Sequence, residues 1–183
     1  MKKLSMEELN RKSVEEFKEA KKSPLVIVLD NVRSLNNVGS AFRTSDAFLV
    51  EKICLCGITG CPPHREIQKT ALGATESVAW EYFPSTSDAL KALKSQGYTI
   101  CAFEQVDKSV KLDEFQPDVY GKYALVFGNE VFGVEPEAIQ ESDVVIEIPQ
   151  LGTKHSLNIS VTMGIAIWDF SVKMGVLKKN HQS

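Results

Sequence analysis

The chain has 183 residues, of which 43% are hydrophobic, and this is enough to bury the core of one domain. No apolar run approaches the roughly 18 residues that a membrane span needs, and the charged N-terminus lacks the apolar core of a signal peptide. We therefore expect a cytoplasmic protein without membrane contact. The net charge of -3, from 21 Lys and Arg against 24 Asp and Glu, argues mildly against a nucleic-acid partner unless positive charge gathers locally.

Residues 1–23 are expected to form an amphipathic helical extension of the main domain. Residues 5–8, Ser-Met-Glu-Glu, fit a capping box. Apolar or small residues then recur at helical spacing, at Met6, Leu9, Ser13, Phe17 and Ala20. The remaining positions carry both lysines and glutamates, and such a mixed face is normally solvated. Packing on the main domain is therefore favoured over a direct contact with RNA.

Short apolar runs alternate with helical segments after Pro24. Strands buried on both faces are expected over residues 25–29, 52–56, 78–83, 98–103, 123–127 and 143–148. Helices are expected over residues 37–49, 64–72, 87–96 and 134–141, with a long apolar helix over 156–177. This alternation predicts an α/β fold with a parallel sheet over residues 24–177, followed by a short tail at 178–183.

The cysteines do not indicate a metal site. Cys54, Cys56 and Cys101 lie in apolar runs of strand length, which is typical of buried thiols in a chain that needs no disulfides. Cys54, Cys56 and Cys61 have no second Cys or His pair at ligand spacing, so we expect no zinc.

Polar residues are concentrated in three loops that each follow a predicted strand, where parallel sheets bind ligands. Residues 30–44 run into a helix through an asparagine cap. Arg43 comes six residues after Asn37, and it can point back to the loop if both lie on one helix face. An ordinary surface arginine is an equally weighted alternative.

The second and third loops carry a glycine pair and a polar helix start. In residues 128–133, Gly128 allows close approach of a ligand to the backbone, and Glu130 can accept hydrogen bonds. The chain contains neither the dinucleotide nor the P-loop glycine pattern. In residues 148–160, Ser156 is the expected cap of the last helix. Asn158 would then lie just inside that helix, where asparagine is unfavourable, so its presence is harder to explain by stability.

Together these segments resemble the motifs of the SpoU/TrmH branch of the SPOUT methyltransferases. The pattern N-x-G-x-x-x-R-T stands at residues 37–44, G-x-E-x-x-G at 128–133, and I-P followed by S-L-N-x-S at 148–160, in the family's order. Residues 69–74 also look like the family, so the resemblance covers about residues 24–173. Asn129 stands where many members have proline or serine, a departure at a small loop position.

The resemblance implies a fold, a reaction and an assembly. The fold is a parallel-sheet α/β SPOUT domain with a C-terminal deep trefoil knot. The reaction is methyl transfer from S-adenosylmethionine, without a metal, to a ribose 2′-hydroxyl of RNA, with tRNA slightly favoured over rRNA. The assembly is a homodimer whose active site uses residues of both subunits. The alternatives are a SPOUT methyltransferase that acts on an RNA base and a catalytically silent, knotted RNA-binding protein.

Site residues also follow from the resemblance. The implied catalytic and substrate residues are Asn37, Arg43, Glu130, Ser156 and Asn158. The implied cofactor contacts, mainly through the backbone, are Ala102, Gly128, Ile148, Ser156 and Leu157. The implied RNA contacts are Arg33, Arg65, Lys69 and Lys154. Because a guanidinium keeps its proton near neutral pH, we expect Arg43 to stabilise negative charge rather than to act as a base.

Overall fold

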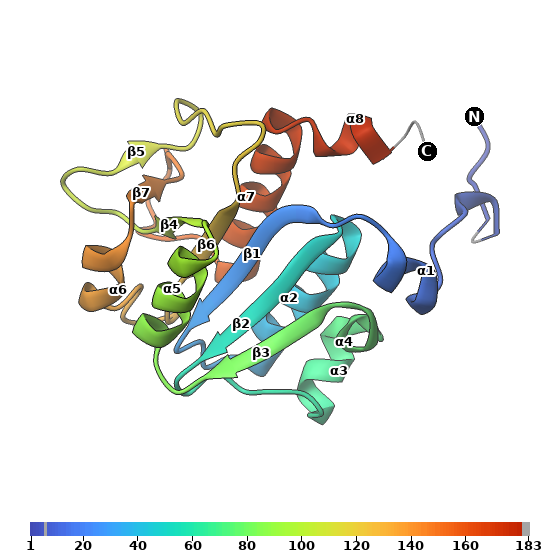
Figure 1. Ribbon diagram of the computed structural model, residues 1–183, viewed down its shortest axis with the longest axis horizontal. Coiled ribbons are helices and arrows are strands. Elements are labelled where there is room, and N and C mark those ends of the chain that lie inside the picture. Colours follow the sequence, from blue (N-terminus) through green and yellow to red (C-terminus); the bar gives the residue numbers. More distant parts are fainter. Residues whose placement is uncertain (6, 181–183) are drawn as a thin grey trace.

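A parallel β-sheet forms the centre of the computed structural model, which describes residues 1–5 and 7–180 (Figure 1). Within these residues the sheet has seven strands in the order β3-β2-β1-β6-β4-β7-β5, and every pairing is parallel. The strands are β1 (Ser23–Asp30), β2 (Val50–Cys56), β3 (Ala79–Phe83), β4 (Thr99–Phe103), β5 (Val110–Lys111), β6 (Tyr123–Phe127) and β7 (Val144–Glu147). The predicted α/β fold is therefore confirmed, while the trefoil knot stays a prediction.

Helices cover both faces of the sheet, which makes three layers (Figure 1). One face packs against α2 (Leu35–Ala47), α3 (Arg65–Ala71), α4 (Ala74–Ser77) and α7 (Ile159–Lys173). The other face packs against α5 (Thr86–Ser95) and α6 (Pro136–Glu141). Among the described residues, no helix is long and apolar enough to cross a membrane.

Because helices pack on both faces of the sheet, the central strands carry long apolar runs. Successive side chains of a strand point to opposite faces. In β1, Leu25, Ile27 and Leu29 therefore join the core under α2 and α7, whereas Val26 and Val28 join the core under α5. All five side chains are fully buried, so each face of β1 needs apolar residues.

Strand β3 differs from the expected burial on both faces. It lies at the edge of the sheet and pairs only with β2. Trp80 and Tyr82 are exposed at 37% and 47% of their surface. The prediction of a doubly buried strand here was wrong, because an apolar run does not reveal whether a strand has one neighbour or two. The two-residue strand β5 was not predicted, since two residues are too few to show a period.

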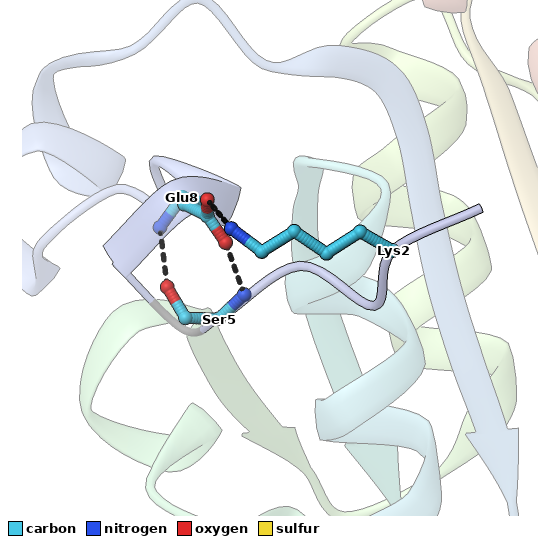
Figure 2. A network of polar contacts seen from close by, with 3 residues as sticks. All are labelled: Lys2, Ser5 and Glu8. Atoms are coloured by element: carbon cyan, nitrogen blue, oxygen red, sulfur yellow. Dashed lines mark hydrogen bonds and ion pairs between the residues drawn. The ribbon is translucent and has the colours of Figure 1, made fainter.

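The N-terminal extension contains two short helices instead of one. The first is the 3₁₀ helix η1 (Glu7–Leu9), and Asn10 then adopts a left-handed φ of 45° that ends it. Ser5 and Glu8 exchange the reciprocal hydrogen bonds of a capping box, 2.7 and 3.3 Å long, and Lys2 pairs with Glu8 at 2.9 Å (Figure 2). Met6 lies outside the described residues.

The second N-terminal helix joins the extension to the domain. Helix α1 (Val14–Glu19) starts with a capping box of its own, made by Ser13 and Glu16. Phe17 is buried and belongs to the core beneath α4 and α7. Helix α1 therefore packs on the main domain through Phe17, whereas Leu4 and Leu9, earlier in the extension, are exposed.

The C-terminal apolar segment is also two helices. Gly175 has a φ of 68° and separates α7 from α8 (Val176–Asn180), so the expected boundary between residues 177 and 178 falls inside α8. Ile159, Met163, Ile167, Phe170 and Met174 are buried, as expected for a mostly apolar segment.

The close packing of α2 on α3 can be tested by a substitution at Gly39. A Cβ at this position would collide with the Thr70 hydroxyl and the Ile67 carbonyl oxygen. Gly39→Ala should therefore lower the free energy of unfolding by about 1–3 kcal/mol, measured by denaturant titration. Gly152→Ala in the exposed stretch before α7 is the matched control, because a Cβ there meets nothing within 4 Å and should leave stability unchanged. Equal stability of Gly39→Ala and the parent would contradict the packing.

Candidate functional site

A cavity of about 740 Å³ opens beyond the carboxyl ends of β4, β6 and β7. Its size and position are typical of a cofactor site in an open parallel sheet. Its walls come mainly from three stretches of the chain, residues 103–106, 127–134 and 146–159, of which residues 149 and 151–154 do not touch the cavity. Pro136, Ile139 and Thr162 complete the lining. The second and third predicted loops therefore line one space.

Two glycines close the loop that follows β6. A Cβ on Gly128 would collide with the backbone of Gly133 and Val134, so the chain passes too close for any side chain. Asn129 and Gly133 exchange two backbone hydrogen bonds of 2.8 and 2.9 Å. Gly133 has a φ of 73°, which glycine adopts without strain. The glycine spacing of this motif thus has a structural explanation in the closed loop.

Glu130 joins this loop to the loop that follows β1. Its Oε1 accepts hydrogen bonds from the Ser34 backbone at 2.9 Å and from the Asn37 side chain at 3.0 Å. Its Oε2 accepts one from the Arg33 backbone at 3.0 Å. Because β1 and β6 are neighbours in the sheet, the loops after them lie side by side. The structure therefore brings Asn37 and Glu130 together, as the predicted site requires.

These hydrogen bonds keep Glu130 ionised. Partial burial alone would raise the pKa of Glu130, but the hydrogen bonds from Arg33, Asn37 and Ser34 outweigh this, and the pKa of the carboxyl lies below its ordinary value. At neutral pH the side chain is therefore an acceptor and not a proton donor.

Arg43 lies apart from this pair. Helix α2 begins at Leu35 and is capped by the Ser34 side chain, which accepts from the Asn37 backbone at 3.3 Å, so the expected asparagine cap was wrong. Six residues span about 600° of an α-helix, which places Arg43 on a different face from Asn37. Arg43 is exposed, does not line the cavity and makes no hydrogen bond or ion pair within the described residues.

The start of α7 corrects two expectations. Asn158, not Ser156, is the N-cap, and its side chain accepts from the Ser160 backbone at 2.8 Å. Asparagine is among the best N-cap residues, so the stability of the helix explains its presence at this position, and a role of Asn158 in catalysis stays a prediction. The error arose from starting the helix too early. Ser156 and Asn158 nevertheless both line the cavity.

Most of the expected cofactor contacts surround the cavity. Gly128, Ile148, Ser156 and Leu157 line it. Ala102 does not, because it is fully buried in β4 between Val126 and Val145, and the next residues of the chain, Phe103 and Glu104, reach the cavity instead.

The expected RNA contacts are exposed but lie on three elements. Arg33 borders a second cavity of about 340 Å³, together with Ser34, Glu130 and Val131. Arg65 and Lys69 are on α3, where Lys69 pairs with Glu66 at 2.7 Å. Lys154 is in the exposed stretch 151–158. Only Arg33 is next to the Glu130 and Asn37 pair.

Glu104 and Asn129 were not predicted as site residues, although both line the cavity. Oε2 of Glu104 accepts from the Val134 backbone at 3.1 Å, which fixes the end of the glycine loop. Glu104 directly follows β4, and Asn129 is the second residue after β6. This position just after a buried strand is the signal that could have revealed them.

The cysteines contribute no ligands to the site. Cys54, Cys56 and Cys101 are buried, and burial raises the pKa of the Cys54 thiol to about 12. Among the described residues, no group of three His, Cys, Asp or Glu side chains could hold a metal ion.

Comparison with known proteins gives a consistent set of relatives. The SpoU rRNA Methylase family model matches residues 24–168. The tRNA (guanosine(18)-2′-O)-methyltransferase of Thermus thermophilus is 30% identical over 162 residues, which are 88% of this chain and 81% of that protein.

Two solved structures have a similar fold. The TrmH/SpoU tRNA modifying enzyme of A. aeolicus matches with a TM-score of 0.79 and 28% identity, covering 90% of this chain and 82% of that one. The AdoMet-bound rRNA methyltransferase from Sinorhizobium meliloti matches with a TM-score of 0.76 and 25% identity. That match covers 85% of this chain but 59% of the longer Sinorhizobium chain.

Replacing Glu130 should give a pH-dependent loss of stability. A carboxylate whose pKa is lowered by folding stabilises the protein above its unfolded pKa, and this contribution is lost as the pH falls through the folded pKa. Glu130→Gln should therefore lower the unfolding temperature by a few degrees near pH 7, and the difference should shrink below about pH 4.5, the ordinary value.

Thermal unfolding across this pH range measures the effect. Glu137→Gln is the matched control, because Glu137 is exposed in α6 and should show no such difference. A Glu130→Gln effect that is equally large at about pH 3 would contradict an ionised, hydrogen-bonded carboxylate.

Proposed function

Because the chain belongs to the SpoU rRNA Methylase family, we propose that it is an RNA (ribose-2′-O-)-methyltransferase that uses S-adenosylmethionine. The observation that carries this proposal is that Glu130 joins Asn37, in the first turn of α2, to the loop that lines the 740 Å³ cavity. The Glu130 carboxylate thus lies between Asn37, which we expect on the substrate side, and a cavity large enough for the cofactor. The similar proteins of known name act on tRNA and on rRNA, and we favour tRNA slightly, with the reaction placed in the cytoplasm.

The cavity suits S-adenosylmethionine in size and in charge. Its volume is within the usual range for sites that hold ligands of this size. Gly128, Ile148 and Leu157 offer backbone groups to an adenosine, while Glu104, Glu130 and Glu147 give the lining a negative charge without any Lys or Arg. A negative lining favours a positively charged sulfonium. When bound, the cofactor would supply an electrophilic methyl group, and the 2′-hydroxyl that accepts this group would release its proton to solvent.

The residues of the chain position and stabilise the reacting ribose. Glu130 is ionised and holds the Asn37 amide, so that Asn37 keeps a fixed orientation. Arg33 borders the second cavity, where a guanidinium can bind a backbone phosphate of RNA. We assign the guanidinium of Arg43 to a neighbouring phosphate and to the negative charge that develops on the 2′-oxygen.

A homodimer is part of this proposal, because α7 leaves an apolar face uncovered. Its exposed stripe consists of Val161, Ile165, Trp168 and Val172. These positions are four, three and four residues apart, so they form one face of the helix. A second copy of the chain would bury this stripe. Because Arg43 does not line the cavity of its own chain, we assign it to the site of the second subunit.

The assay that tests the function uses RNA that lacks the modification. The purified chain with labelled S-adenosylmethionine should transfer label to tRNA, and nucleoside analysis should find a 2′-O-methylated ribose. Arg43→Ala should lower the single-turnover rate about a hundredfold or more, with cofactor affinity within about threefold of the parent. Arg43→Lys should recover only a small part, because lysine loses the planar fork of arginine.

Label on a base would favour the base-directed alternative, and cofactor binding without transfer to any cellular RNA would favour the silent RNA-binding protein. Mixing Arg43→Ala with a cofactor-deficient Gly128→Val chain tests the assignment to the second subunit. Mixed dimers then contain one intact site and should regain activity. No recovery would place Arg43 in its own subunit's site.

Trp168 tests the dimer. Trp168→Glu puts a charge into the stripe on α7 and should convert a dimer of about twice the chain mass of 20.3 kDa into monomers in sedimentation at micromolar concentration. Trp80→Glu is the matched control, because Trp80 is the other tryptophan of the chain and is exposed on β3, away from α7. A parent chain that sediments as an active monomer would refute the dimer.

A further inference from the structure

Asn129 precedes Glu130, and both polar atoms of its side chain make hydrogen bonds. It is 8% exposed. Its Oδ1 accepts from the backbones of Val131 at 2.9 Å and Phe132 at 3.2 Å. Its Nδ2 donates to the carbonyl oxygen of Asn31 at 2.7 Å. Because the oxygen receives two N–H groups and the nitrogen meets a carbonyl, only one orientation of the amide satisfies the network.

The carbonyl that Asn129 binds belongs to a firmly held residue. Asn31 adopts a left-handed φ of 54°, and its side chain contacts three different elements. Its Nδ2 donates to Asp30 at 3.1 Å and to Glu135 at 2.7 Å, and its Oδ1 accepts from the Ile58 backbone at 3.0 Å. Asn31 is therefore held in place, and its carbonyl oxygen is a rigid acceptor for Asn129 on the proposed substrate side.

Asn129 lies at the boundary between the two cavities. Its own loop lines the 740 Å³ cavity, and the next residue, Glu130, also borders the 340 Å³ cavity with Arg33 and Ser34. Loss of the bond between Asn129 and Asn31 would free the two loops to separate. The hydrogen bonds from Arg33 and Ser34 to Glu130 would then lengthen, since both donors lie within three residues of Asn31.

We propose that Asn129 is a positioning residue. It holds the Glu130 carboxylate against the loop after β1, on the proposed substrate side, and it shapes the loop after β6, which lines the proposed cofactor cavity. It acts through Glu130 and does not touch the reacting atoms. This inference rests on the proposed methyltransferase function for its effect on turnover. The geometric part, the joining of two loops by one amide, does not depend on that function.

Asn129→Asp separates the two roles of the amide. The new carboxylate still accepts from Val131 and Phe132, but it cannot donate to Asn31 and faces a carbonyl oxygen. Turnover should fall about tenfold or more, as expected for loss of a buried hydrogen bond, while cofactor affinity stays within about threefold. Amide hydrogen exchange of the chain without ligands should speed up about tenfold or more at Arg33 and Ser34 and stay unchanged at Val131 and Phe132.

The exchange measurement needs neither RNA nor cofactor, so it tests the positioning even if the parent chain methylates no RNA. Asn129→Ser removes the donor without adding charge and should give the same pattern, which covers the case in which the aspartate variant does not fold. Asn10→Asp is the matched control, because it makes the same change at an exposed position in the N-terminal extension and should alter neither readout.

A double-mutant cycle with Glu130→Gln distinguishes positioning from general destabilisation. If Asn129 acts through Glu130, Asn129→Asp should lower turnover less than about threefold further in the Glu130→Gln chain. An undiminished tenfold loss in that background would overturn the proposal. Unchanged exchange at Arg33 and Ser34 in both Asn129 variants would overturn it as well.

Discussion

The carboxylate of Glu130 accepts three hydrogen bonds from residues that are 93 to 97 positions earlier in the chain. The rest of the site depends on this contact, because it fixes the separation of two loops that have no regular structure of their own. The contact is possible because β6 inserts next to β1, so that the chain leaves the sheet at Asp30 and at Gly128 side by side. Charge-assisted hydrogen bonds of this type are stronger than neutral ones, which suits an exposed loop that must keep its geometry.

A second carboxylate, that of Asp30, stabilises the same end of the sheet. Asp30 is fully buried, and an isolated charge there would be very unfavourable. Three donors offset this cost, the Thr86 hydroxyl at 2.5 Å, the Glu135 backbone at 2.7 Å and the Asn31 side chain at 3.1 Å. The start of α5, the start of α6 and the loop after β1 therefore meet at one group. Burial and the charge of Asp30 both raise the pKa of Glu135, whose side chain accepts from the same Asn31.

The overall charge of the chain is compatible with an RNA substrate because of how the charges are arranged. The cofactor-sized cavity is lined by carboxylates, whereas Arg33 and Arg43 lie outside it. The chain has a net charge of -3, but it places negative charge in the pocket for a cationic cofactor and basic groups toward solvent. Burial of the α7 stripe in a dimer would bring the basic groups of two chains onto one assembly.

The sequence by itself determined the features that depend on neighbouring residues. Apolar runs identified the central strands, such as 123–127, and the apolar positions of α7 from Ile159 to Met174. The resemblance of the motifs to the family pointed to Asn37, Gly128 and Glu130, and for Gly128 and Glu130 the conformational freedom of glycine and the acceptor chemistry of a carboxylate agree with it. Only the tertiary structure decided the strand order, the exposure of β3, the place of Arg43 away from its own cavity and the partners of Asn129. These features depend on hydrogen bonds and packing between segments up to about a hundred residues apart, and no local period records which distant segments will meet.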